Sequence, residues 1–209
     1  MDRWEMYFDI IKINFRRNFL PSLIMGVLLL LFIPFLFGIT ELDTREAAMP
    51  LELMVSLCGI LMMTTVFYPE QKVNVKDLAE SKWIDHLLVC KLRLGYSAGT
   101  VFLFTGCFTA VMKAFGSQVT LEHFLGTAAT AFFLGSLGAF ACGLSGNIAI
   151  GYMVPLVYYL INYSSRAMGK FYLFSMQMGS TEEKLWLAAA GIVLLFLLFG
   201  IKRIQMRIR

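Results

Sequence analysis

Charged side chains are scarce in this chain, and they are missing from the centres of its apolar runs. Asp, Glu, Lys and Arg make up 15% of the 209 residues and hydrophobic residues 58%, whereas soluble domains hold about 25% charged residues. An ordinary water-soluble domain is therefore excluded. Ion-coupled transporters place ionisable groups inside the membrane, so the charge-free centres also argue against that class. Glu52, Lys113 and Glu122 stand near the ends of apolar runs, where we expect their side chains to reach the membrane surface.

Histidine and cysteine are also few, which leaves little for catalysis or metal binding. The two histidines and four cysteines have no spacing typical of a zinc site. The sequence has no G-x-x-x-x-G-K-[ST] signature, so this chain has no P-loop with which to bind ATP. We therefore predict no catalytic residue, no metal and no cofactor in this chain.

One short motif is similar to a catalytic one. Residues 143–146 read Gly-Leu-Ser-Gly, which matches the G-x-S-G pattern of rhomboid intramembrane proteases. Such a serine needs a histidine base from a later helix, and both His86 and His123 precede Ser145. We expect a Gly-Ser-Gly turn between two helices instead.

Long apolar runs are what the chain does have. A transmembrane helix needs about 20 mostly apolar residues to cross the hydrocarbon core. Runs of about this length predict one all-α membrane domain over residues 1–209, with six transmembrane helices at 20–39, 50–68, 96–115, 122–144, 148–164 and 185–201. The fourth run carries small residues at three- to four-residue spacing, which predicts close packing against other helices.

The segments outside these runs have patterns of their own. Residues 1–19 place Trp4, Phe8 and Ile11 on one helical face, which predicts an amphipathic helix lying in the membrane interface. The stretch 69–95 is the longest hydrophilic one, and Asn74 can cap a short helix within it. The stretch 164–184 is polar at its ends and apolar at its centre, so we expect a short interfacial or re-entrant helix there.

The basic residues indicate the orientation. Most of the 18 Lys and Arg residues lie in the amino-terminal segment, the 69–95 loop and the carboxy-terminal tail. Cytoplasmic loops of membrane proteins hold an excess of Lys and Arg. We therefore expect a multi-pass protein of the bacterial inner membrane with both termini in the cytoplasm, and we read the net charge of +4 as a membrane signal that predicts no nucleic-acid partner.

The order of these segments resembles the type 2 ABC transporter permeases, the membrane subunits of many bacterial exporters. The resemblance covers nearly the whole chain and is carried by the leader 4–19, Tyr-Pro-Glu at 68–70, Asp-Leu-Ala-Glu-Ser-Lys at 77–82 and Lys-Leu-Arg at 91–93. It implies that 1–19 is a connecting helix and that 69–95 holds a coupling helix seated on an ATP-binding subunit. The coupling residues would be Glu70, Val75, Asp77, Leu78, Glu80, Lys82 and Trp83.

The same resemblance implies a function. The chain would be the permease of an ATP-driven exporter, paired with a second permease subunit of the same or a different chain, with ATP and magnesium on the partner ATPase and membrane lipids around it. The substrate pathway would use the second and fifth spans, through Met54, Cys58, Met62, Asn147, Tyr152, Tyr158, Tyr159 and Asn162. Aromatic residues near span ends also serve as interface anchors, so both interpretations of the tyrosines stay open.

Two alternatives belong to other classes. A substrate-binding membrane subunit of a vitamin-type ABC importer would also have six helices, but it would need a small-residue stripe on its first span, where this chain is bulky from Leu28 to Phe32. An intramembrane serine protease depends on Ser145 and lacks a base. The sequence leaves open the substrate, homodimer against heterodimer, and export against import.

Overall fold

The computed structural model of the protein describes residues 12, 15–71, 86–164 and 169–208. Every regular element in this part of the chain is helical. In chain order the elements are η1 (Phe15–Phe19), α2 (Leu20–Phe37), α3 (Thr44–Pro50), η2 (Leu51–Val55), α4 (Leu57–Met63), η3 (Thr64–Gln71), α6 (His86–Ala114), α7 (Leu121–Ser145), α8 (Ile148–Ser164), η4 (Gly169–Phe171), η5 (Met176–Met178) and α9 (Glu182–Ile208).

Five helical stretches of the described chain are long and apolar enough to cross a membrane. They are Leu20–Phe37, Thr44–Phe67, Leu88–Ala114, Leu121–Ser145 and Glu182–Gln205. The predicted sixth, α8, is apolar but has 17 residues and is shorter than these. The prediction of an all-α fold is therefore confirmed for the described residues, with five candidate membrane-spanning helices, while the count of six spans stays a prediction.

Helix ends differ from the predicted ranges where hydropathy alone set them. α6 begins at His86, so residues 86–95 belong to this helix and not to the hydrophilic loop in which we placed them. α9 begins at Glu182 and continues to Ile208, past the predicted end at 201. The first extension holds four leucines with Lys91 and Arg93, and the second holds glutamate, lysine, arginine and methionine. These residue types favour helix, and the charged ones do so even where they are too polar to lie in lipid.

The second span is one continuous rod of several helical types. α3 starts it at Thr44, before the predicted start at 50, and η2 follows Pro50, which has no N–H to donate. Within η2 the Ser56 N–H donates to Leu51 O at 3.2 Å, the wide spacing of a π turn. Such turns are frequent at functional sites, and this one holds Glu52.

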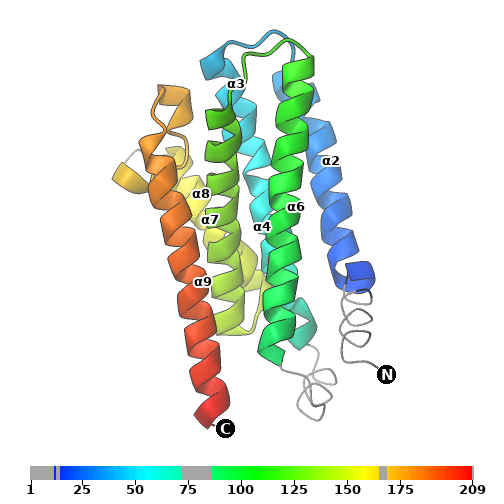
Figure 1. The fold of residues 1–209 in the computed structure, drawn as a ribbon, viewed down its shortest axis with the longest axis vertical. Helices are drawn as coiled ribbons and strands as arrows, with labels where there is room; N and C mark the ends of the chain where they lie inside the picture. The colour runs from blue at the N-terminus through cyan, green and yellow to red at the C-terminus, as the bar shows by residue number, and fades with distance from the viewer. Residues whose placement is uncertain (1–11, 13–14, 72–85, 165–168, 209) are drawn as a thin grey trace.

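α7 is the central helix of the bundle, in contact with α4, α6, α8 and α9 (Figure 1). A Cβ at Gly59 of α4 would overlap the Ala131 carbonyl of α7, and a Cβ at Gly135 would lie 2.6 Å from Gly59 O. Gly138 lies equally close to α8, because a Cβ at Gly138 would be 3.0 Å from the carbonyl oxygen of Gly151. The prediction that the small residues of this span serve close packing is confirmed.

α2 begins and α9 ends at one end of the bundle, which we call the terminal end; α6 begins there too (Figure 1). The connections 38–43, 115–120 and 169–181 lie at the opposite end. The outward faces of the helices are apolar, with Phe35 85% and Phe196 75% exposed. Such faces suit a hydrocarbon surrounding better than water, and with the five long helices they indicate a membrane protein.

Candidate functional site

A buried pair of opposite charges lies near the opposite end of the bundle. Glu52, in the π turn η2, is 0% exposed, and Lys184, in the first turn of α9, is 4% exposed. Their side chains form an ion pair with 2.5 Å between Glu52 Oε1 and Lys184 Nζ. Burying a charge without a partner costs several kcal/mol, so the rest of the site must complete the hydrogen bonding of both groups.

The carboxylate of Glu52 is completed by the backbone of the connection between α8 and α9. Its Oε1 accepts the Met176 N–H at 3.0 Å and its Oε2 accepts the Gln177 N–H at 3.2 Å. Both donors belong to η5. Gly126 of α7 leaves the room for this arrangement, because a Cβ there would lie 2.5 Å from Met176 Sδ and 3.3 Å from Lys184 Cγ. Glu52 therefore attaches the second span to the connection.

The ammonium of Lys184 has three hydrogens, and the site provides three acceptors. Besides Glu52 it donates to Thr130 Oγ1 of α7 at 3.0 Å and to the carbonyl oxygen of Leu173. The second span, α7, α9 and the connection thus meet at one nitrogen. A cluster with every donor filled acts as a fixed cross-link between these elements.

α8 holds the connection from its other side. Tyr158 OH donates to Phe171 O at 2.7 Å, and the Leu173 N–H donates to Asn162 Oδ1 at 3.2 Å. Tyr159 OH donates to Leu53 O of the second span at 2.7 Å. Residues 173–176 of the connection are buried by these contacts. In place of the single short helix we expected, the described part of the connection has two short 3-10 turns, η4 and η5.

The eight predicted pathway residues do not form one lining. Tyr152, Tyr158 and Tyr159 pack against one cluster, while Asn147 and the residues of the second span lie elsewhere. Tyr158, Tyr159 and Asn162 point to the connection and the second span, as above. Cys58 and Met62 are fully buried in the core around α4, and Met54 packs against the core formed with Ile33. Tyr152 packs in the cluster that holds Leu134, and Asn147 is exposed at the turn before α8, where its Oδ1 accepts the Ala149 N–H at 2.9 Å. Their role in a pathway stays a prediction.

Most of the predicted coupling residues lie outside the described part of the chain. Glu70 lies in η3, at the terminal end of the bundle. Val75, Asp77, Leu78, Glu80, Lys82 and Trp83 lie outside the described residues.

The prediction for Glu52 was wrong. We expected its side chain to reach the membrane surface. Lys113 and Glu122, for which we expected the same, are exposed, but Glu52 is buried and paired. The sequence did hold a signal. Glu52 and Lys184 each border an apolar run on the same expected side of the membrane, and two opposite charges so placed can neutralise each other.

Ser145 ends α7 in the expected turn, with Gly146 in the left-handed conformation at φ 65°. Its hydroxyl donates to Ala141 O at 2.7 Å. His123 lies at the other end of the same helix, about 33 Å away at about 1.5 Å per residue, where its Nε2 is 2.8 Å from Thr44 O. His123 is therefore out of reach as a base for Ser145.

The described site is an ion pair that cross-links the elements around it. It ties the connection to three membrane helices, and each of its oxygens and hydrogens already has a partner within the chain. Comparisons of the chain with protein-family models, with curated proteins and with solved structures each gave no match.

Proposed function

We propose that this chain is the membrane-spanning permease subunit of an ATP-driven ABC exporter, forming a substrate pathway with a second permease subunit and coupled to separate ATP-binding subunits. The observation that carries the proposal is the structural difference between the two ends of the bundle. η1, η3 and the start of α6 lie at the terminal end, and a buried, ion-paired connection lies at the opposite end (Figure 1).

The terminal end has contacts that suit the transfer of motion into the membrane. The last turn of the leader, η1, runs directly into α2. Phe19 of this turn contacts Tyr96 of α6 edge to face with 4.9 Å between ring centroids, and Phe15 contacts the same ring at 5.9 Å. A push on the leader or on the start of α6 would therefore reach both helices at once.

The charges support an orientation with the terminal end in the cytoplasm. Among the described side chains every carboxylate lies at the opposite end, in residues 41–52, 122 and 182–183. The terminal end holds the cations Lys12, Arg16, Lys91, Arg93, Lys202 and Arg203. An excess of Lys and Arg is typical of the cytoplasmic side, which is where partner ATPases of a bacterial inner membrane would bind.

The mechanism would be a population shift between two packings of the bundle. ATP binding would close the partner ATPases, and the stretch 69–95 would pass their motion into the second span and α6. Because the Glu52–Lys184 cluster joins the second span, α7, α9 and the connection, these elements would move together at the opposite end. The pathway would then open along the second span and α8.

The first test is co-purification. The tagged chain would be solubilised from its native membrane in a mild detergent, and its companions identified by mass spectrometry. A P-loop ATPase in near-equal amount is expected, and a second membrane subunit would decide between homodimer and heterodimer. A chain that repeatedly purifies alone would contradict the proposal.

A substitution then tests the coupling. Leu78→Asp should abolish stimulated ATP hydrolysis in the reconstituted complex, because it places a charge on the proposed apolar docking face. Lys76→Ala in the same stretch is the control and should change the rate little, since exposed ion pairs contribute less than about 1 kcal/mol. Unchanged coupling in Leu78→Asp would remove the coupling-helix assignment.

A second candidate function is proton-coupled transport, favoured by the buried Glu52 and Lys184 themselves. Vesicle transport driven by a pH gradient without ATP would support it. Two features weigh against it: the pair lies near one end of the bundle, and each oxygen of Glu52 and each hydrogen of the Lys184 ammonium already has a partner.

A further inference from the structure

The second span ends, at the terminal end of the bundle, in a 3-10 helix of unusual length. η3 covers 8 residues, Thr64–Gln71, and follows the α-helical α4 without a break. Runs of 3-10 helix longer than about three or four residues are uncommon. The first half of η3 is packed inside the bundle, where Thr64, Val66 and Phe67 are at most 3% exposed. The local sequence and the neighbouring helices must therefore favour this form over a continued α-helix.

Pro69 disfavours the α-helix at this point. In an α-helix the carbonyl of Thr65 would accept the N–H of residue 69, four positions on, but proline has no N–H and its ring would meet that carbonyl. In a 3-10 helix the donor lies three positions on, so the carbonyl that lacks a donor from its own helix is that of Val66. Pro69 therefore moves the gap in the hydrogen bonding from one carbonyl to the next.

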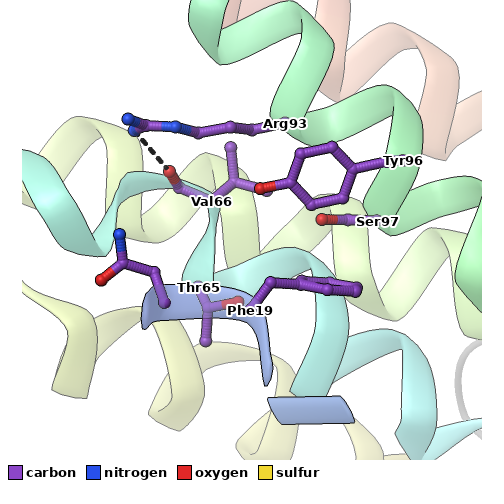
Figure 2. Close-up of a pocket in the computed structure, with 7 residues that line it drawn as sticks. Phe19, Thr65, Val66, Arg93, Tyr96 and Ser97 are labelled. Atoms are coloured by element: carbon purple, nitrogen blue, oxygen red, sulfur yellow. Dashed lines mark hydrogen bonds between the residues drawn. The ribbon is translucent and has the colours of Figure 1, made fainter. Parts of the chain in front are cut away.

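Arg93 of α6 fills the gap at Val66. Its Nη1 donates to Val66 O at 3.4 Å, and Figure 2 shows the side chain extending from α6 to this oxygen. The hydrogen bond is long, but a charged donor makes a hydrogen bond about twice as strong as a neutral one does. A neighbouring helix thus supplies the donor that Pro69 lacks.

The 3-10 and α forms of such a segment differ in length and in twist. A 3-10 helix rises about 2.0 Å and turns about 120° per residue, against about 1.5 Å and 100° in an α-helix. A change of all of η3 to α-helix would therefore shorten it by about 4 Å and unwind it by about 160°. The Glu52–Lys184 pair holds the other end of the span, so the displacement would appear at Gln71, where the stretch 72–85 begins.

We propose that η3 is a two-state segment and that Arg93 is the latch that holds it in the 3-10 form. In the latched form the guanidinium fills Val66 O. In the released form η3 winds as an α-helix and Val66 O accepts the Glu70 N–H. Pro69 keeps the released form higher in free energy, so a displacement of Arg93 shifts the balance between the two. The latch is a property of this chain alone, and only its use for ATP-driven motion rests on the proposed function.

The test uses the purified full-length chain in nanodiscs without any ATPase, so its failure would leave the exporter proposal untouched. Backbone hydrogen exchange is measured over residues 64–71. Arg93→Met should raise exchange in this segment about tenfold, the effect expected from the loss of a hydrogen bond with a charged donor. Arg203→Met removes an exposed cation of α9 at the same end. It is the matched control and should change exchange less than about twofold.

Pro69→Ala separates the latch from general packing. Alanine restores an N–H at position 69, so Val66 O no longer depends on α6, and Arg93→Met added to this variant should change exchange less than about twofold. Alanine also removes the ring that opposes the α-helix. In a cysteine-free background, spin labels at Gln71→Cys and Glu182→Cys should therefore show a second distance about 4 Å shorter. Arg93→Met should show the same second distance.

Several results would overturn the proposal. Unchanged exchange in Arg93→Met, or an equal rise in Arg203→Met, would mean that this hydrogen bond does not hold η3. An equal effect of Arg93→Met with and without Pro69 would mean that the guanidinium does not replace the missing N–H. Faster exchange without the shorter distance would indicate fraying in place of a second helical form. If Arg93→Met elutes as aggregate in size-exclusion chromatography, Pro69→Ala decides: without the shorter distance the proposal fails.

Discussion

Glu52 and Lys184 are almost fully removed from water, yet both carboxylate oxygens and all three ammonium hydrogens have partners within the chain. Such a pair is weak evidence of net stabilisation, because desolvation offsets much of the attraction between the charges. Removing one partner is a different matter. It leaves the other as an uncompensated buried charge, and this makes the site sensitive to single substitutions.

Substituting one partner of the pair tests this sensitivity. Lys184→Met should lower the free energy of unfolding by about 3 to 5 kcal/mol, since the carboxylate of Glu52 would keep two backbone donors but lose its counter-charge. The measurement is unfolding in mixed detergent micelles. The double variant Glu52→Gln with Lys184→Met should lose less than the two single variants together.

The control for this experiment is Lys113→Met. Lys113 is exposed at the end of α6, so its loss should change the unfolding free energy by less than about 0.5 kcal/mol. A similar loss in both lysine variants, or an additive double variant, would show that the buried pair is not coupled.

Between elements, the contact of α4 with α7 depends on the absence of a side chain at Gly59. Alanine favours a helix over glycine by about 1 kcal/mol, but at this position its Cβ would overlap a backbone carbonyl that cannot move aside. Steric overlap wins, because overpacking a close helix contact costs about 1 to 3 kcal/mol or more. The helices must separate to relieve it.

Gly59→Ala should therefore destabilise the protein, seen as a lower midpoint of thermal unfolding in detergent. Gly99→Ala in α6 is the matched control, because a Cβ there has nothing within 4 Å, and it should be neutral or slightly stabilising. Equal behaviour of the two variants would mean that α4 and α7 are packed less closely than described.

The connection 169–181 owes its position to single hydrogen bonds from α8 as well as to the ion pair. In Asn162→Leu the Leu173 N–H would lose its acceptor while staying buried, at a cost of about 1 to 3 kcal/mol. We expect faster hydrogen exchange over residues 171–178 with little change in α7. Asn162→Asp keeps the acceptor oxygen and should retain more protection than Asn162→Leu; the reverse order would argue against this hydrogen bond.

The whole molecule is polarised, with its described carboxylates at one end and most of its described cations at the other. This arrangement predicts a single orientation in the membrane. In a cysteine-free background, a membrane-impermeant maleimide should label Glu182→Cys in intact cells, and Arg203→Cys only after permeabilisation. Labelling in the opposite pattern would invert the assigned topology, and with it the placing of partner ATPases.

The sequence by itself determined an all-helical fold with helices long and apolar enough to cross a membrane. Hydropathy is a property of neighbouring residues, and a run of about 20 apolar residues has few other ways to satisfy its backbone. It also predicted the packing role of the small residues in α7, since their spacing follows the helical period. Helix ends were less predictable, as at His86, because helix propensity continues where hydropathy stops.

Only the tertiary structure decided what the polar residues do. Glu52, read alone, stands at the end of an apolar run and should extend to the surface. Its burial depends on Lys184, Met176 and Gln177, which are far away in the sequence and come close only when α9 and the connection fold against the second span. Hydropathy is fixed by neighbours along the chain, whereas the compensation of a buried charge is fixed by neighbours in space.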